Sequence, residues 1–421
     1  MNTRRQWPKD TLLLNNSLFF LLLIFLSLIF FAMVRDNAFW HQSDYLYLNQ
    51  ALEIESNWRA IFDAAPFGIF QPLVNSVFFV EYHLFGLNAS YYYLFNIFFH
   101  ALNSFLVYVI VFTLLRDRTI AVLSSLLFVF AVGNYGKAVM VASGISDLLI
   151  TLLTLLTLLF YFKNELEKGG RMWSFWFVGS MLFFGLSLLS KATSFSILGC
   201  MLAFNILFRS EIRKPVFHRN FLIVTIFALA VLVAKHSYFM DIPGRYDMIF
   251  ISPRFFRNFG SYLVRMVFPI HGSRLVTHAG PFVQFFYDLA TEIRILTFLC
   301  ILSYSIFGFI FGNRTIRFFI AWTYITVLPF CFFKFPDDWL NIRYLYLVSV
   351  GFVMLLASGT VLAARLLYQR PWRRFVPYVI PLVFILLSHF ITSNLDKNYE
   401  RNAATERIQQ MHNAFVERAR E

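Results

Sequence analysis

Charged residues are scarce in this chain: Asp, Glu, Lys and Arg together make up 14% of its 421 residues. This is too few to cover the surface of a water-soluble protein. Hydrophobic residues make up 59% of the chain and aromatic residues 20%. Apolar runs of about 20 residues recur from end to end, which excludes a soluble multidomain enzyme, a fibrous repeat and a disordered chain. The sequence predicts an all-α, polytopic, integral membrane protein.

Cysteine is also rare. The three cysteines, Cys200, Cys300 and Cys331, fall inside apolar runs, without a CxxC pair or a nearby histidine. This pattern argues against a disulfide framework and against a zinc site. We interpret the cysteines as small core residues.

Acidic residues are outnumbered by basic ones, 23 to 36, which gives a net charge of +13. Such an excess can indicate nucleic-acid binding, but here the basic residues form short clusters between apolar runs. Lys and Arg are retained in short cytoplasmic loops, so membrane topology explains the clusters better. We expect contacts with membrane lipids and none with nucleic acid.

About eleven apolar segments are candidate membrane spans. They lie at roughly 11–34, 91–115, 119–141, 144–162, 172–190, 192–208, 220–237, 290–311, 318–333, 344–364 and 375–392. With the N-terminus inside, the cytoplasmic connectors hold 18 of the 36 basic residues but only five of the 23 acidic ones. This asymmetry predicts a cytoplasmic N-terminus.

The outer side then carries two long connectors, at about 35–90 and 238–289. Aromatic residues interspersed with polar ones in the first connector predict amphipathic helices in the membrane interface. We expect one transmembrane domain over residues 1–392 and a polar extracytoplasmic tail over 393–421. The tail is charged without a clear apolar stripe, which predicts a frayed helix or disorder.

Four ionisable residues lie near the outer ends of predicted spans: Asp44, Asp147, Lys191 and Arg343. A charge at this depth needs a partner, a water-filled cavity or an interfacial position. Each residue alone could be an interfacial anchor. Their convergence on one membrane face favours a site, because a pair such as Lys191 and Arg343 suits a phosphate headgroup.

Further candidates lie on both sides of this set. Arg257 and Arg265 in the second long connector could also bind phosphate, although ordinary interfacial basicity is the alternative. Asn96, His100 and Asn103 share one face of the second span, where a hydrogen-bonded packing seam is the commoner interpretation.

Two adjacent carboxylates, Asp337 and Asp338, could bind a divalent cation such as Mg or Mn, or pair with Arg343. Adjacent loop carboxylates are usually solvated, and a hard cation prefers more oxygen ligands than two residues supply. We therefore treat the metal as optional and expect no other cofactor.

Several segments resemble a known family. Gln71-Pro72-Leu73-Val74-Asn75, Glu81-Tyr82, Tyr93-Leu94-Phe95-Asn96 and His100-Ala101-Leu102-Asn103 resemble the first-loop-to-second-helix block of GT-C membrane glycosyltransferases. Ser143-Gly144-Ile145-Ser146-Asp147-Leu148-Leu149, Leu189-Ser190-Lys191 and Arg343-Tyr344-Leu345-Tyr346 look like the family segments GRxDLL, LSKE and RYLYLPS. The likeness points to the transmembrane O-mannosyltransferases that target cadherins and to their bacterial relatives, without the tetratricopeptide array.

The resemblance implies a GT-C-type fold, a polyprenyl-phosphate-linked sugar donor, and transfer to a protein or glycan hydroxyl on the extracytoplasmic side. A mannosyl group is one candidate. It also implies that an acidic residue in the first outer loop is the catalytic base, which maps here onto Asp44. The supporting site residues to which the matching motifs point are Glu81, Asn96, His100, Ser146, Asp147 and Tyr344.

We therefore predict an inverting glycosyltransferase, with Asp44 as base and with Arg343 and Lys191 stabilising the departing lipid phosphate. A polytopic transporter or lipid flippase is one alternative, although transporters tend to carry their ionisable groups nearer the midplane. A catalytically silent GT-C homologue is another, because Ser43 stands where the family commonly has a second acidic residue. The expected location is a bacterial inner membrane.

Overall fold

The computed structural model describes residues 9–63, 70–130, 136–167, 170–208, 214–239, 253–267, 290–332, 342–367, 372–389 and 406–420. Within these ranges the secondary structure is helical and contains no strand. The predicted all-α class is thereby confirmed for the described part of the chain.

The long helices follow the apolar runs. They are α1 (Lys9–Phe30), α4 (Ala89–Leu115), α5 (Arg118–Phe130), α7 (Ile145–Glu167), α8 (Phe175–Ser190), α9 (Ser196–Leu207), α10 (Lys214–Phe239), α13 (Ala290–Phe311), α14 (Arg314–Cys331), α15 (Leu345–Leu366) and a helix at Phe375–His389. Smaller elements are η1 (Ala32–Val34), α2 (Gln42–Ser56), η2 (Trp58–Phe62), α3 (Pro72–Phe85), α6 (Lys137–Met140), η4 (Ala142–Gly144), η5 (Ala192–Phe195), α11 (Pro253–Val267), η7 (Ile342–Tyr344), η8 (Arg373–Tyr378) and α17 (Glu406–Arg418).

Helical structure lies within each predicted span, but helix positions alone do not fix the number of membrane crossings. By length and composition alone, four helical segments in the described part of the chain could each cross a membrane: Ala89–Leu115, Ala142–Glu167, Glu292–Phe311 and Leu345–Leu366. Other apolar helices are shorter. The total of eleven crossings therefore stays a prediction.

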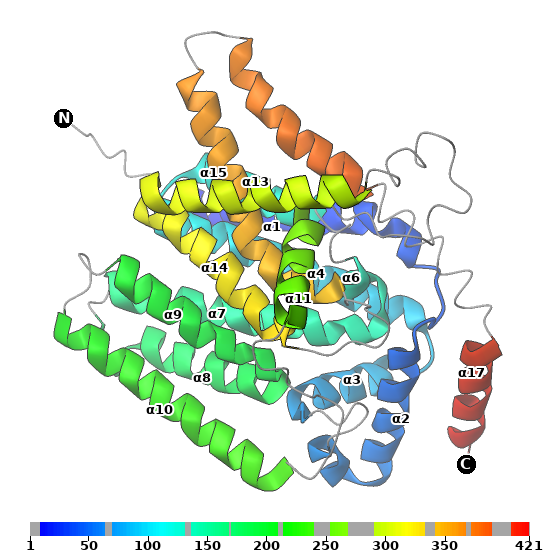
Figure 1. Cartoon of the computed structure of the whole chain (residues 1–421). Coiled ribbons are helices and arrows are strands. Elements are labelled where there is room, and N and C mark those ends of the chain that lie inside the picture. The colour runs from blue at the N-terminus through cyan, green and yellow to red at the C-terminus, as the bar shows by residue number, and fades with distance from the viewer. Residues whose placement is uncertain are drawn as a thin grey trace.

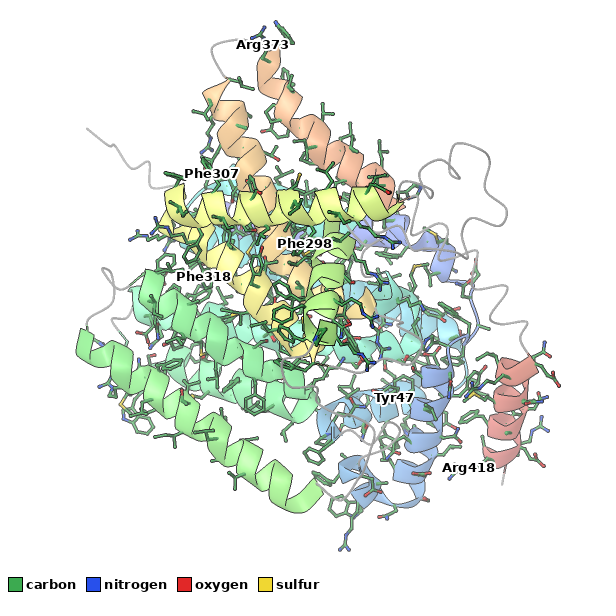
Figure 2. All side chains as sticks on the ribbon, viewed as in Figure 1. Tyr47, Phe298, Phe307, Phe318, Arg373 and Arg418 are labelled. Atoms are coloured by element: carbon green, nitrogen blue, oxygen red, sulfur yellow. The ribbon has the colours of Figure 1, made fainter. Side chains whose placement is uncertain are left out.

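Helix α7 is central, because it packs against α4, α8, α9 and α15. Of the residues in its most apolar stretch, 89% are buried inside the protein. Helix α13 is peripheral, because no residue in its most apolar stretch is buried inside the protein. Figure 1 shows α8, α9 and α10 side by side, and α13 crossing the molecule above α11. Figure 2 shows Phe307 on α13, and its side chain is 61% exposed.

The segment predicted as the first outer loop contains α2, η2 and α3, which fold back onto the bundle through contacts with α7, α8 and η4. Local sequence sets the helix starts. His41 and Asp44 form a capping box at the start of α2, and Pro72 occupies the first turn of α3. These caps place Asp44 against the bundle.

Two sequence predictions need correction. The predicted span 119–141 is not one helix, because α5 ends at Phe130 and the separate helix α6 begins at Lys137. After α6, Gly144 allows a close approach of η4, since a Cβ there would lie 2.1 Å from the carbonyl oxygen of Ala138. The turn that carries Ser143 is therefore packed tightly against α6.

The second correction concerns the tail, where α17 is a regular helix with an apolar stripe of Ile408, Met411 and Phe415. Phe415 is buried against the ring of Tyr82, with centroids 6.3 Å apart. Arg418 pairs with Glu53 of α2 at 3.3 Å. The stripe was missed because its three residues are spread among charged ones, and its partner surface comes from a distant segment.

Three of the connectors predicted to be cytoplasmic meet in the structure. Arg116 pairs with Glu167 at 3.0 Å, and Arg365 pairs with Asp117 at 2.6 Å. These contacts join the α4–α5 turn to the ends of α7 and α15. They support one common side for these basic connectors.

Close packing of α14 on α15 depends on Gly351. A Cβ at this position would lie 2.5 Å from Thr323 Oγ1 and 2.9 Å from the indole of Trp322. We expect Gly351→Ala to destabilise the protein by about 1–3 kcal/mol through overpacking, measured as a loss of thermal stability in detergent. Gly260→Ala is the control, because a Cβ there makes only ordinary contacts of 3.6 Å; equal effects would contradict the packing argument.

Candidate functional site

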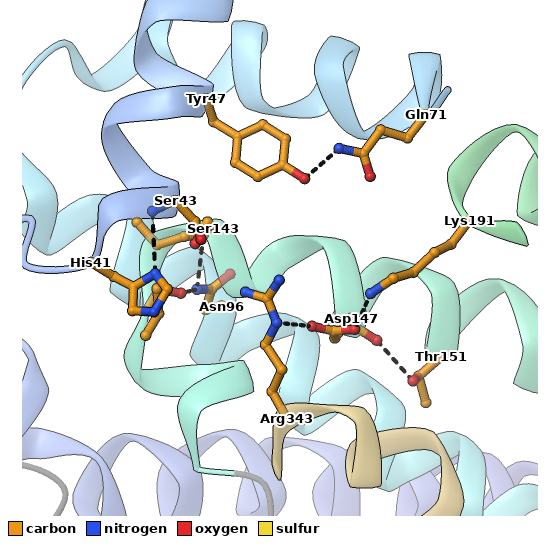
Figure 3. Close-up of polar contacts among 12 residues, drawn as sticks. His41, Ser43, Tyr47, Gln71, Asn96, Ser143, Asp147, Thr151, Lys191 and Arg343 are labelled. Carbon is orange, nitrogen blue, oxygen red and sulfur yellow. Dashed lines mark hydrogen bonds and ion pairs between the residues drawn. The ribbon is translucent and has the colours of Figure 1, made fainter. Parts of the chain in front are cut away.

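A buried charge cluster lies where α7, α8 and η7 meet. Asp147 in the first turn of α7 accepts from Lys191 Nζ at 2.5 Å and lies 3.1 Å from Arg343 Nε, as Figure 3 shows. The side chains of Asp147, Lys191 and Arg343 are 5%, 12% and 11% exposed. One carboxylate thus orients two cations from segments far apart in sequence.

Tyr344 provides an aromatic face beside both cations. Its ring centroid lies 5.0 Å from Lys191 Nζ and 6.0 Å from Arg343 Cζ. The ring stacks on Phe330 with centroids 4.8 Å apart. Cation–π contacts of this kind orient a cation without neutralising its charge. Burial and neighbouring Arg343 lower the pKa of Lys191, although Asp147 opposes the shift.

Asp44 connects the start of α2 to η4. Its Oδ1 accepts the backbone N–H of Ser143 at 2.8 Å, and its Oδ2 accepts that of His41 at 3.2 Å. The side chain is fully buried, which raises the pKa of Asp44 to about 6 against the two hydrogen bonds and the charge of Arg343. Asp44 is therefore a structural cap whose carboxyl holds its proton more tightly than an ordinary aspartic acid.

Three further residues at this site were not singled out from the sequence: His41, Tyr47 and Lys137. Burial, Arg343 and Lys137 lower the pKa of His41 to about 3, so the imidazole is neutral. Tyr47 accepts from Gln71 Nε2 at 2.5 Å. Their sequence signal is weak, because only the fold brings residues of α2, α6 and η7 together.

The polar stripe on α4 is a packing seam, as one of its two interpretations proposed. Asn96 Nδ2 donates to the Val141 carbonyl at 2.9 Å, and His100 Nδ1 lies 2.8 Å from the Tyr346 hydroxyl. Asn103 Nδ2 donates to the Leu148 carbonyl at 3.0 Å. These bonds hold the segments on either side of Ser143 and Asp147 in place. Asn96 and His100 therefore belong to the packing around the segment that carries Ser143 and Asp147.

The other supporting candidates are placed differently. Ser146 is buried in the first turn of α7, one residue before Asp147. Glu81 is buried in α3, and neither of its carboxylate oxygens has a hydrogen-bond partner among the described residues. Burial raises the pKa of Glu81 well above its ordinary value, which favours the neutral acid.

Arg257 and Arg265 line a groove between α11 and α13 that includes neither Lys191 nor Arg343. Arg257 and Arg265 are therefore not part of the cluster formed by Asp147, Lys191 and Arg343. Asp337 and Asp338 lie outside the described residues. Among the residues that the structure describes, no group of three or more His, Cys, Asp or Glu side chains is arranged to hold a metal ion.

No protein-family model and no curated protein sequence matches the chain. The apo oligosaccharyltransferase of Archaeoglobus fulgidus matches with a TM-score of 0.54 and 13% identity, over 90% of this chain and 56% of that one. The archaeal oligosaccharyltransferase AglB from Archaeoglobus fulgidus, in complex with an inhibitory peptide and a dolichol-phosphate, matches over 90% of this chain and 56% of that one with a TM-score of 0.53 and 13% identity. The fold is of the GT-C glycosyltransferase type.

The GT-C fold predicted from the sequence is thereby confirmed, and the protein is an integral membrane protein. ArnT from Cupriavidus metallidurans bound to undecaprenyl phosphate matches more weakly, with a TM-score of 0.43 and 13% identity over 92% of this chain and 78% of that one. The chain spans just over half the length of AglB. At this identity the likeness shows the GT-C fold alone.

Proposed function

We propose that this protein is an inverting glycosyltransferase that takes a sugar from a polyprenyl phosphate and transfers it to a protein or glycan hydroxyl. The convergence of Asp44, Asp147, Lys191 and Arg343 from four separate segments carries the proposal. A GT-C fold supports it, and so does a neighbour of that fold whose structure contains dolichol-phosphate. A mannosyl donor and a bacterial inner membrane, with the site outside, are part of the proposal.

The chemistry needs one base and one site for the leaving phosphate. Asp44 would take the proton of the acceptor hydroxyl as its oxygen attacks the anomeric carbon. The bond between that carbon and the phosphate oxygen breaks, and the electron pair leaves with the phosphate. Arg343 and Lys191 would stabilise the phosphate charge in a water-poor site. A single displacement inverts the anomeric configuration.

Asp147 would act as a positioning residue in this mechanism. It contacts both cations, so it fixes the directions of Lys191 and Arg343 before the donor binds. Asp44 has no exposed surface. An acceptor hydroxyl therefore reaches it only after the groups that cover Asp44 move aside, so local opening precedes transfer in this mechanism.

The decisive experiment measures free polyprenyl phosphate released by the purified protein from a panel of lipid-linked sugars with a broad acceptor mixture. Release that depends on the acceptor supports the transferase and names its donor. A well-folded protein that releases nothing from any donor would favour a transporter or a silent homologue. Parallel reactions with a chelator, and with Mg or Mn restored, test the proposed metal role of Asp337 and Asp338.

The pKa of Asp44, about 6, predicts the pH dependence of transfer. We expect kcat/KM to fall about tenfold per pH unit below pH 6, because the base must be ionised. The ordinary pKa is 3.8, so the folded protein holds this proton more tightly, and the contribution of Asp44 to stability rises as pH falls from 6 to 3.8. Protonation of Asp44 therefore does not destabilise the fold, and it cannot lower kcat/KM by unfolding the protein. A profile flat from pH 5 to 8 would contradict the base assignment.

A further inference from the structure

The side chain of His41 is accessible at the start of α2, beside the candidate base. It is partly exposed, whereas Trp40 before it and Ser43 and Asp44 after it are buried. His41 is the N-cap residue of α2 and has an extended backbone, so its side chain stands at the open end of the helix. A ligand can therefore contact His41 while Asp44 is still covered.

Two contacts fix the direction of the His41 ring. The backbone N–H of Ser43 donates to Nδ1 at 3.2 Å. On the other side, Trp40 meets the ring edge to face, with centroids 5.9 Å apart. Trp40 is itself held in place, because its Nε1 donates to the carbonyl oxygen of Met140 at 3.0 Å. The imidazole is therefore oriented by the protein before any ligand binds.

The contact at Nδ1 also places the ring hydrogen. A neutral imidazole has one nitrogen that accepts and one that donates, so Nδ1, which accepts from Ser43, leaves the hydrogen on Nε2. In the part of the chain that the structure describes, Nε2 makes no hydrogen bond. An oriented N–H group in a partly covered position thus lacks an acceptor, which a ligand oxygen would supply.

The charges around His41 favour an anionic ligand. Burial and the charges of Arg343 and Lys137 lower the pKa of His41 to about 3, so the ring is neutral at pH 7. Figure 3 shows His41 and Arg343 on either side of Asn96. Two cations whose charge reaches the ring create a positive potential there, and a hydrogen bond to an ionised oxygen is stronger than one to a neutral oxygen.

We propose that His41 is a further ligand of the donor phosphate, with its Nε2–H donating a hydrogen bond to an oxygen of the polyprenyl phosphate that Arg343 binds. The contact stabilises the charge that the phosphate gains as the sugar leaves, and the hydrogen stays on the nitrogen. The inference rests on the proposed function for the identity of this phosphate.

Two substitutions separate this role from helix capping, because each keeps a different half of the imidazole. Asn is among the best N-cap residues, and its Oδ1 can accept the Ser43 N–H, but its shorter side chain has no donor at the position of Nε2. Gln places an N–H donor at that position but is not a preferred N-cap residue. Stability should therefore be lower in His41→Gln, and phosphate binding should be lower in His41→Asn.

The measurement is the affinity of the full-length purified protein in detergent for undecaprenyl phosphate, determined by native mass spectrometry. Undecaprenol, the same chain without the phosphate, is the second probe. We expect His41→Asn to weaken undecaprenyl phosphate binding about 10- to 100-fold, the usual effect of losing a hydrogen bond to a charged group. Undecaprenol binding should not change, and His41→Gln should stay close to wild type. His83→Asn is the matched control, because His83 is exposed in the same connector.

A loss in His41→Gln equal to or larger than that in His41→Asn would follow the cap and overturn the proposal. It is also overturned if the wild type binds undecaprenol as tightly as undecaprenyl phosphate, or if His83→Asn shows the same loss. Thermal unfolding of each variant reports the cap separately.

The release assay with lipid-linked sugars separates this inference from the proposed function. Transfer by the wild type, with unchanged phosphate binding in both His41 variants, would reject His41 as a ligand and keep the transferase. Phosphate binding that depends on His41, without transfer from any donor, would keep the ligand and reject the transferase.

Discussion

Replacing Asp44 by Asn should lower the rate of sugar transfer by about 10²- to 10⁴-fold, the usual contribution of a general base. Asn keeps the size of the side chain and one acceptor oxygen, which can still bind the Ser143 N–H. It removes the charge that would receive the acceptor proton. The measurement is the rate of polyprenyl phosphate release at saturating donor, at pH 7.5.

The fold should survive this change. One of the two backbone hydrogen bonds of Asp44 is lost, at a cost of about 1–2 kcal/mol, so thermal stability should fall only slightly. Asp63→Asn is the matched control, because Asp63 lies exposed in the same connector. Full activity in Asp44→Asn would leave Asp44 with its capping role alone.

Replacing Asp147 by Asn should destabilise the protein by about 3–5 kcal/mol, because it removes the carboxylate that contacts both buried cations, Lys191 and Arg343. The expected observation is a large loss of thermal stability in detergent. Donor affinity should fall as well, since the two cations lose the group that orients them. Glu53→Gln is the control, because its pair with Arg418 is exposed and contributes about 0–1 kcal/mol.

A second replacement should partly rescue the first. In Asp147→Asn/Lys191→Met one of the two cations that Asp147 contacts is removed as well, so the combined loss of stability should be smaller than the sum of the single losses by about 0.5–3 kcal/mol. Lys191→Met alone completes the cycle. Strict additivity would mean that the 2.5 Å contact between Asp147 and Lys191 does not contribute to stability.

Sequence alone was sufficient for most of the long helices and for the position of the charged residues near their ends. Apolar runs predicted a helix at each span, because burying about 20 apolar residues in a bilayer requires a hydrogen-bonded helix. Asp147, Lys191 and Arg343 were placed near helix ends on one face, because charges at membrane depth are costly. The motifs around Asp147 and Arg343 also pointed to the GT-C fold that the structural comparison shows.

Only the tertiary structure decided which charges meet. Arg265 and Arg343 are both candidate phosphate ligands in the sequence, yet Arg343 contacts Asp147 while Arg265 lines the groove between α11 and α13. Spacing along a helix shows which residues share a face, but the partner of that face depends on how distant helices pack. The same reason explains why α17 was missed, because the partner of its apolar stripe is a distant segment, where Phe415 packs against Tyr82. Local sequence therefore determined the helices, and long-range packing determined the site.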